Sequence, residues 1–379
     1  MGINVPVRVL LYIGLALLTM HFLVPALYYV VARSWLRRGN EAYDFGGSVG
    51  IYPRVSVIVP TYNEARVILR RLDNIAEQDY PRDRLEVIVV DGGSNDGTVE
   101  LVKRWAQEHG DVRVKIIEEG ARLGKSHALN TALKYAEGDI VVITDADSLW
   151  FRDSLRNAVR WLMRGDVGAV SCSKSPKEDV AIEGKYRSYY GILRLAESRK
   201  YSSPIFHGEL AAFKRDLLMK VGGFPTHIGA DDSHTASLIA LMGYRAVIPE
   251  DVRCIEYVPR RGYWSWRLRR AQHLIQHFTG IIGLIIRGTR VPRDYLPIIL
   301  TEAYLHVVNP WLLLLGLALI IPAALHGMLI PTVLLALGAL LLVVSKFFRT
   351  WVATQAILIA AAIKNLWNKE LVWRKEEKE

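Results

Sequence analysis

Two carboxylates one residue apart end a strongly apolar segment of the chain. Asp145 and Asp147 close the run 139–147, whose aliphatic residues are typical of a strand buried in an α/β sheet. Such sheets bind ligands at the carboxyl ends of their strands. Acids held this close repel each other unless a cation or hydrogen bonds share their charge. The pair therefore predicts a site for a hard divalent ion that also binds phosphate, with simple capping of the next helix as the alternative.

Two further polar segments follow apolar runs. Residues 60–64 (Pro-Thr-Tyr-Asn-Glu) end the run 54–60, and residues 91–98 (Asp-Gly-Gly-Ser-Asn-Asp-Gly-Thr) follow the run 85–90. Because neighbouring parallel strands end at one edge of a sheet, we expect both segments to line the same crevice as the acid pair. The glycines of 91–98 let backbone approach a ligand, and the helix that follows can receive negative charge at its N-terminus. Turn and capping chemistry explains each segment alone, but not their convergence.

The elements that must position these segments alternate between strands and helices. Strands are predicted at 54–60, 85–90, 112–117 and 139–144, and helices at 65–78, 98–108 and 126–136. Alternation at this spacing is typical of parallel βαβ units and predicts an α/β domain. From 149 to 257 the pattern loosens, with helices predicted at 153–164 and 233–242 and short strands at 167–171 and 245–248.

Long apolar segments on both sides of this domain predict a membrane protein, since about 20 apolar residues cross the hydrocarbon layer. The predicted order is a transmembrane helix at 5–32, a linker or interfacial segment at 33–52, a cytosolic domain at 53–258, amphipathic interfacial helices at 259–290, transmembrane helices at 296–325 and 328–345, and an interfacial helix with a charged tail at 346–379. A cleaved signal peptide is less favoured for the first segment, because it is long and has no small-x-small cleavage site.

The net charge of +10 indicates orientation and lipid attraction. Basic residues follow the first and third predicted spans, at 33–38 and 346–364. The C-terminal end of each of these two spans, and the domain that follows the first one, are therefore predicted on the cytoplasmic side of the cell membrane. Because these residues flank apolar spans and no nucleic-acid motif is present, membrane lipid headgroups are favoured over nucleic acid as partners. No obligatory protein partner is inferred.

Several motifs are set aside. Cys172 and Cys254 are expected to form neither a disulfide framework nor a metal site, in keeping with a reducing cytosol. Residues 120–126 resemble a phosphate-binding P-loop but have three residues between the glycines where four are required. His273 and His277 lack the glutamate of a zinc protease, and no Gly-x-Gly-x-x-Gly follows the first strand, which disfavours a dinucleotide-dependent oxidoreductase.

Taken in order, the segments 60–64, 91–98, 124–130 and 145–147 resemble the nucleotide-sugar half of family 2 glycosyltransferases. The resemblance extends through Gly-Gly-Phe at 222–224 and Ala-Asp-Asp at 230–232. These enzymes are inverting and have the GT-A fold, and the membrane plan is similar to that of cellulose-synthase-like members. The resemblance implies an α/β fold: a GT-A nucleotide-sugar-binding domain with a parallel-type central sheet, interfacial helices and about three transmembrane helices.

The resemblance also implies roles for matching residues. Ala-Asp at 230–231 replaces the family's Thr-Glu, so Asp231 is the alternative to Asp232 as general base, and Phe206 equally suits an ordinary core position. The implied set is Pro60, Thr61, Glu64, Asp91, Asp96, Lys125 and Asp145 for the nucleotide sugar; Asp147 with Asp145 for Mg²⁺ or Mn²⁺; Asp232 or Asp231 for catalysis; and Phe206, His207, Trp266, Arg269 and Arg270 for the acceptor or the membrane interface.

The implied activity is transfer of a hexose to a lipid-linked acceptor of the dolichol or polyprenol type, in glycan or N-glycan biosynthesis. Mannose from GDP-mannose is favoured as donor, with UDP-glucose or UDP-N-acetylglucosamine second. Residues 266–270 (Trp-Arg-Leu-Arg-Arg) lack the Gln and final Trp of the Gln-x-x-Arg-Trp motif of processive synthases, which favours a single addition. A processive synthase and a non-catalytic nucleotide-sugar-binding protein stay open, whereas a channel or transporter is disfavoured because the spans largely lack charged or broken-helix sites.

Overall fold

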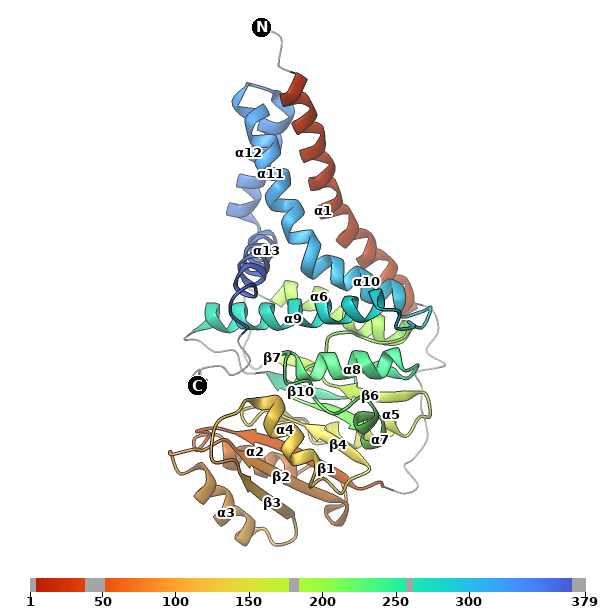
Figure 1. The fold of residues 1–379 in the computed structure, drawn as a ribbon, viewed down its shortest axis with the longest axis vertical. Helices are drawn as coiled ribbons and strands as arrows, with labels where there is room; N and C mark the ends of the chain where they lie inside the picture. Colours follow the sequence, from red (N-terminus) through yellow and green to blue (C-terminus); the bar gives the residue numbers. More distant parts are fainter. Residues whose placement is uncertain (1–4, 38–51, 177–183, 257–261, 370–379) are drawn as a thin grey trace.

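The computed structural model of the 379-residue chain describes residues 5–37, 52–176, 184–256 and 262–369. Figure 1 shows an elongated molecule with a sheet domain at one end and a bundle of long apolar helices at the other. Helices α6 (Gly184–Lys200), α9 (Tyr263–Ile286) and α10 (Leu296–Ala303) lie across the boundary between these two parts. These three helices therefore connect the sheet domain to the bundle of apolar helices.

The first half of the sheet confirms the predicted βαβ alternation. It contains β1 (Val55–Thr61), α2 (Ile68–Ala76), η1 (Arg82–Arg84), β2 (Leu85–Asp91), α3 (Thr98–Glu108), β3 (Arg113–Glu118), α4 (Lys125–Leu133) and β4 (Ile140–Ile143). These strands are parallel and lie in the order β3-β2-β1-β4. Thr61 pairs with Asp91, so β1 and β2 end side by side, and the polar segments after the strands meet at one edge as expected.

The second half makes the sheet mixed rather than wholly parallel. The segment between 149 and 257 supplies β5 (Leu149–Trp150), α5 (Ser154–Leu162), β6 (Val167–Ser171), β7 (Ser173–Pro176), β8 (Ala211–Lys214), α7 (Arg215–Lys220), α8 (Asp231–Leu241), β9 (Arg245–Val247) and β10 (Arg253–Glu256). Strand β8 lies antiparallel between β4 and β6, which extends the sheet to seven strands, while β5, β10 and β7 form a separate three-stranded sheet. The weak periodicity of this segment reflects these short strands.

Both faces of the main sheet are covered. Along β1, Val57 and Val59 pack with α2, α3 and α5 on one face, whereas Ile58 packs with α4 and α8 on the other, as the two-residue period of a strand requires. Phe278 of α9 and Tyr295, just before α10, belong to the second cluster and are wholly buried. The helices nearest the bundle of apolar helices therefore share a core with the sheet domain.

Within the described residues, three helices are long and apolar enough to cross a membrane: α1, at Pro6–Arg37; a continuous stretch at Leu296–Leu325; and α13 (Lys346–Lys364). The second stretch comprises α10, the π-helical turn η2 (Tyr304–Val308) and α11 (Asn309–Leu325). The predicted spans 5–32 and 296–325 coincide with two of these helices. Close packing of α1 on α11 requires Gly14, where an added Cβ would meet Ile320 at 2.7 Å.

The third predicted span, 328–345, corresponds to α12 (Leu329–Val344), which has only 16 residues. Helix α13, predicted to be interfacial, is the one with the length and composition of a span. Ser345 separates the two helices, and the guanidinium of Arg349 donates to the carbonyls of Leu342 and Val343 at the end of α12. Figure 1 shows α13 continuing from α12 towards α9, so the two helices run back towards the sheet domain in series.

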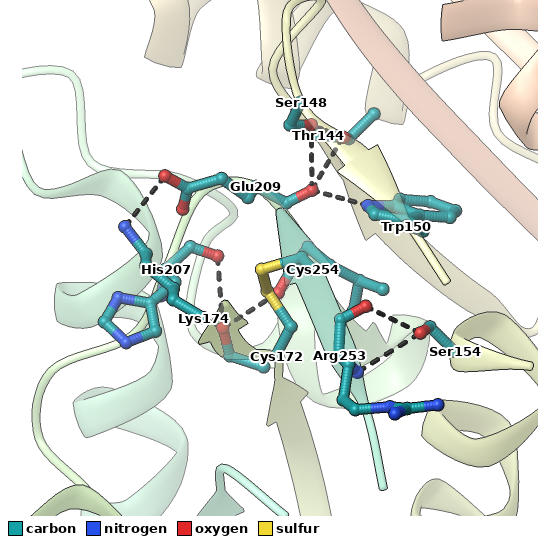
Figure 2. Close-up of a disulfide and its surroundings, with 12 residues drawn as sticks. Thr144, Ser148, Trp150, Ser154, Cys172, Lys174, His207, Glu209, Arg253 and Cys254 are labelled. Atoms are coloured by element: carbon teal, nitrogen blue, oxygen red, sulfur yellow. Dashed lines mark hydrogen bonds and ion pairs between the residues drawn. A yellow bond between two sulfur atoms is a disulfide. The ribbon is translucent and has the colours of Figure 1, made fainter. Parts of the chain in front are cut away.

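The cysteine prediction is wrong, because Cys172 and Cys254 form a disulfide (Figure 2). The cysteines are 82 residues apart, but β7 pairs with β10 in the small sheet and brings their Cα atoms to 5.7 Å. Spacing along the chain cannot reveal such a pairing. Because intracellular proteins of hyperthermophiles also contain disulfides, the bond does not identify the compartment.

Replacing both cysteines by serine should lower the melting temperature of the purified chain in detergent. The disulfide closes a loop with a separation of 82 residues, for which the lost restriction of the unfolded chain amounts to roughly 4 kcal/mol. Thermal unfolding of the oxidised protein, the reduced protein and the double variant measures the effect. Equal melting temperatures for all three would contradict a stabilising bond.

Candidate active site

A pocket of about 290 Å³ lies between the carboxyl edge of the main sheet and helices α8 and α9. Its lining combines acids, cations and aromatic side chains from distant parts of the chain. Among the predicted site residues it contains Pro60, Thr61, Glu64, Lys125, Asp145, Asp147, Phe206, Asp231, Asp232, Trp266, Arg269 and Arg270. The tertiary structure thus brings together most of the set that sequence motifs singled out.

Asp91 is predicted to hold a nucleoside, but its carboxylate is occupied within its own loop. One oxygen accepts from the hydroxyls of Thr61 and Ser94, and the other from the backbone N–H groups of Gly93 and Ser94. Asp91 is only 2% exposed. Its contribution to the pocket is therefore to shape the loop after β2, and a direct contact with a nucleoside stays a prediction.

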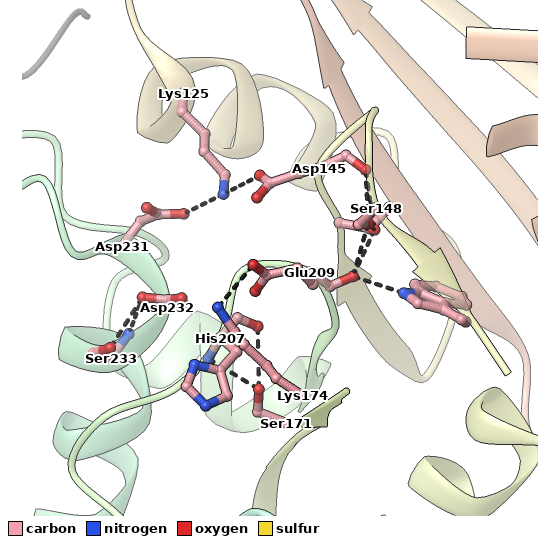
Figure 3. Close-up of polar contacts among 12 residues, drawn as sticks. Lys125, Asp145, Ser148, Ser171, Lys174, His207, Glu209, Asp231, Asp232 and Ser233 are labelled. Atoms are coloured by element: carbon pink, nitrogen blue, oxygen red, sulfur yellow. Dashed lines mark hydrogen bonds and ion pairs between the residues drawn. The ribbon is translucent and has the colours of Figure 1, made fainter. Parts of the chain in front are cut away.

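Asp96 and His207 also lie outside the pocket lining. Asp96 accepts from the backbone N–H groups of Ala65 and Thr98, so it joins the loop after β1 to the start of α3. The backbone N–H of His207 donates to the hydroxyl of Ser171, which donates in turn to the His207 carbonyl (Figure 3). A nucleotide-binding role for Asp96 and an acceptor role for His207 therefore stay predictions.

Lys125, the first residue of α4, joins the two acidic parts of the pocket (Figure 3). Its ammonium lies 2.7 Å from Asp145 and 3.6 Å from Asp231. Burial by itself lowers the pKa of Lys125, but the carboxylates of Asp145, Asp231 and Asp232 outweigh burial and raise it above its ordinary value. Lys125 therefore stays charged at every pH at which the protein functions.

A second cation, Arg71, lies wholly buried behind the acid pair. It donates to the carbonyl of Ser148 at 3.1 Å and lies over the ring of Trp150 at 4.0 Å. Burial lowers the pKa of Arg71 to about 9, and the charges of Asp145 and Asp147 oppose that shift. Sequence reasoning missed this residue, although an arginine on the apolar face of a predicted amphipathic helix was the available signal.

Asp231 and Asp232 form the first turn of α8, across the pocket from Asp145. Burial raises the pKa of both carboxyl groups; that of Asp232 reaches about 7 because the charge of Asp231 adds to burial. Asp232 accepts from the backbone N–H and the hydroxyl of Ser233 at 2.6 and 3.1 Å. A carboxylate held in this way, with a pKa close to neutral, suits proton transfer.

Gly208 keeps open the space between these groups. A Cβ at this position would lie 2.9 Å from the Lys125 ammonium and 3.5 Å from carboxylate oxygens of Asp145 and Asp232. The next residue anchors the loop: the carbonyl of Glu209 accepts from the Trp150 indole N–H at 2.6 Å (Figure 2). The sequence pattern did not single out Gly208, because only the assembled site shows what a side chain there would displace.

Helix α9 closes the pocket on the side of the apolar bundle (Figure 1). Trp266 is buried, and the guanidinium of Arg270 lies 4.7 Å from its ring centre. Trp264, two residues earlier, is 62% exposed. The helix thus presents cations and an indole to the pocket and a second indole to its surroundings, as expected for a helix at a membrane interface.

The donor set fits a divalent metal ion only in part. Asp145 and Asp147 supply the carboxylate oxygens that Mg²⁺ and Mn²⁺ prefer, but the described residues contain no cluster of three or more His, Cys, Asp or Glu side chains able to hold an ion. Asp147 lines the pocket, whereas Asp145 is paired with Lys125. A metal ion at this place would therefore need oxygens of a bound phosphate to complete its coordination.

Comparisons with known proteins agree with this geometry. The chain matches "Glycosyl transferase family 2" over residues 56–222 and "Glycosyl transferase family group 2", which covers more than half of it, over residues 140–364. It is 30% identical over 204 residues to glycosyltransferase AglE of Haloferax volcanii, covering 53% of this chain and 66% of that one. It is 28% identical over 270 residues to a β-monoglucosyldiacylglycerol synthase of Trichormus variabilis, covering 66% and 56%. The chain thus spans less than two thirds of the length of either curated relative.

Among solved structures, the chain is similar to the mannosyltransferase PcManGT from Pyrobaculum calidifontis in complex with GDP-Man and Mn²⁺. The two are 54% identical with a TM-score of 0.86, and the match covers 95% of this chain and 100% of that one. A likeness of this extent includes the sheet domain, α9 and the apolar helices together.

Replacing Lys125 by methionine should destabilise the protein more at about pH 8 than at about pH 5.5. Without the cation, the buried Asp231 and the half-buried Asp145 and Asp232 face one another with no counter-ion. Removing one partner of a buried ion pair costs roughly 3–5 kcal/mol when the remaining groups are ionised. The raised pKa values of Asp231 and Asp232 mean that the folded state binds protons which the unfolded state has released, so stability falls as the pH rises. Melting temperatures in detergent at both pH values measure this.

The matched control is Lys103→Met, which removes an exposed pair with Glu118. Its effect on the melting temperature should be small and equal at both pH values, because exposed ion pairs contribute little to stability. A Lys125→Met variant whose loss of stability does not depend on pH would contradict the assignment of Lys125 as the counter-ion of these acids.

Proposed function

The chain belongs to glycosyl transferase family 2 and is a glycosyltransferase of the GT-A fold; on this premise we propose that it transfers mannose from GDP-mannose to a lipid-linked glycan. The transfer inverts the anomeric configuration, adds one sugar at a time and takes place at the cytosolic face of the membrane. One observation carries the proposal: the similarity over nearly the whole chain to a mannosyltransferase bound to GDP-Man and Mn²⁺. The acid–cation arrangement of the pocket suits the same chemistry.

Lys125, together with a metal ion held by the acid pair, would stabilise the negative charge of the diphosphate. Breaking a glycosyl–phosphate bond builds negative charge on the leaving diphosphate, which a buried, permanently charged ammonium stabilises. Mg²⁺ or Mn²⁺ held by Asp147, with Asp145 beside it, would supply further positive charge. Arg71 lies behind the two acids and offsets part of their negative charge.

Asp232 is the proposed general base, which takes the proton of the acceptor hydroxyl. The acceptor hydroxyl has a pKa far above neutral, so a carboxylate within about 3 Å must take its proton as the oxygen attacks the anomeric carbon. The bond from that carbon to the phosphate oxygen breaks at the same time, and GDP leaves. Asp232 lies across the pocket from Asp145, with the Gly208 gap between them, so the sugar would be attacked on the face opposite the leaving group.

The acceptor side of the proposal rests on α9. Trp266, Arg269 and Arg270 line the membrane-facing end of the pocket. Arginine side chains suit the phosphate groups of a lipid-linked glycan, and an indole suits a sugar ring. The exposed Trp264 and the apolar helices above support a position among membrane lipid headgroups. The basic residues after the first span support the cytosolic orientation.

Membranes that contain the full chain should transfer label from GDP-[¹⁴C]mannose, in the presence of Mn²⁺, to lipid extracted with organic solvent. EDTA should abolish the transfer, because the donor and the metal ion bind together. UDP-[¹⁴C]glucose and UDP-[¹⁴C]N-acetylglucosamine are the comparison donors. Label transferred from a UDP-sugar but not from GDP-mannose would contradict the donor, and a ladder of long products would contradict single addition.

The rate at low acceptor concentration should fall about tenfold per pH unit below about pH 7, because protonated Asp232 cannot act as the base. Asp232→Asn should lower kcat by about 10²–10⁴-fold at all pH values and abolish this limb of the profile. It should retain GDP binding, since Asp232 does not contact the nucleotide in this proposal.

The matched variant for this experiment is Asp231→Asn, which changes the neighbouring acid of the same helical turn. It should keep a pH-dependent limb, shifted to lower pH because a charge that raises the pKa of Asp232 is removed. A larger loss of kcat in Asp231→Asn than in Asp232→Asn would assign the base to Asp231 instead.

A further inference from the structure

We propose that Glu119 recognises the base of the nucleotide donor and selects guanine over uracil. This inference rests on the proposed function, because it takes the donor to be a nucleoside-diphosphate sugar. Glu119 follows β3 and lines the end of the pocket opposite α8. It belongs to none of the motifs that indicated the activity.

The strand order places Glu119 where the base should lie. Along the edge β3-β2-β1-β4, the pocket is lined successively by Glu119, Gly92, Thr61 and Asp145. Neighbouring strands lie about 4.8 Å apart, so the step from β4 to β3 spans roughly 14 Å. A donor whose diphosphate lies at Asp145 and whose sugar points to α8 must extend its nucleoside in the other direction, towards β2 and β3.

Another acid near this end, Asp91, cannot read the base without breaking its own loop. Its carboxylate already accepts four hydrogen bonds from Thr61, Gly93 and Ser94, about the full capacity of such a group. The backbone N–H of Glu119 donates to the Asp91 carbonyl at 2.8 Å, so the two residues are neighbours. The carboxylate of Glu119 thus lies beside the loop without taking part in the hydrogen bonds that hold the loop.

The structure holds Glu119 in place by one oxygen and leaves the other available. Oε1 accepts from Nδ1 of His127 and from the hydroxyl of Thr131, both at 2.8 Å and both on α4. The side chain is only 6% exposed. Oε2 has no hydrogen-bond partner among the described residues, and it is not among the fully buried oxygen atoms that lack one. A glutamate that is fixed through one carboxylate oxygen and has the other oxygen available at the pocket wall is suited to accept hydrogen bonds from a bound ligand.

Guanine matches this acid better than uracil does. The Watson–Crick edge of guanine presents N1–H and the N2 amino group side by side, and the two lone pairs of Oε2 can accept from both. Uracil presents a single N–H between two carbonyl oxygens, which would repel the carboxylate. Arg122, whose guanidinium lies 4.1 Å from the ring centre of Tyr62, adds a flat surface beside Gly92 on which a purine can stack.

The test is equilibrium binding of GDP, IDP and UDP to the full chain in detergent with Mn²⁺, measured by calorimetry. IDP differs from GDP only in lacking the N2 amino group. The wild-type protein should bind GDP about tenfold more tightly than IDP, as expected for one charge-assisted hydrogen bond. Glu119→Ala should bind GDP and IDP equally, and it should bind UDP at least as tightly as the wild-type protein does, because the carboxylate that repels the uracil carbonyls is gone.

Two further variants make the result decisive. Glu119→Gln keeps the shape of the side chain and should also lose most of the preference for GDP over IDP, so a folding defect in the alanine variant does not end the test. Glu118→Ala removes the preceding acid, which pairs with exposed Lys103, and should leave all three affinities unchanged.

Failure of this inference is distinguishable from failure of the proposed function. A preference for GDP over IDP that persists in both Glu119 variants overturns the role of Glu119 and leaves the donor intact. Equal weakening of GDP, IDP and UDP also overturns it, since Glu119 would then only support α4. A wild-type protein that prefers UDP to GDP overturns the donor itself, and base selection by Glu119 with it.

Discussion

The ammonium of Lys125 lies between acids from two separate parts of the fold, 2.7 Å from Asp145 and 3.6 Å from Asp231. None of these groups is stable alone in a desolvated pocket, since an unpaired buried charge costs several kcal/mol. Together they join the end of β4, the start of α4 and the start of α8. The cleft between the two halves of the sheet domain therefore has a defined width before any ligand binds.

The same face of the sheet connects this cleft to the apolar helices. Helix α8, which begins with Asp231, packs in one core cluster with Phe278 of α9. Ser237 of α8 also makes a 2.9 Å hydrogen bond with Tyr295, just before α10. Above this layer Arg194 of α6 contacts Glu302 of α10 at 3.0 Å. The site is thus built against the apolar helices, as the proposed transfer from a soluble donor to a lipid-linked acceptor requires.

Backbone and disulfide contacts hold the part of the pocket around Gly208 and Glu209. The Glu209 carbonyl accepts from the hydroxyl of Thr144, just before the acid pair, at 2.8 Å, while its side chain pairs with Lys174 at 2.7 Å (Figure 2). Lys174 lies on β7, which the disulfide at Cys172 ties to β10, the strand that precedes α9. A network of this kind keeps the Gly208 gap open, because the loop cannot move without breaking several contacts at once.

The sequence by itself determined the βαβ half of the sheet, the apolar helices and most of the pocket lining. Each depends on a pattern within a few consecutive residues, and parallel strands bring their ends to one edge whatever else the chain does. Tertiary structure alone decided the disulfide, the acids that Arg71 lies behind, the occupied carboxylate of Asp91 and the break between α12 and α13 at Ser345. These depend on contacts between residues distant in the chain, and no local pattern encodes which groups will satisfy one another's charge and hydrogen bonds.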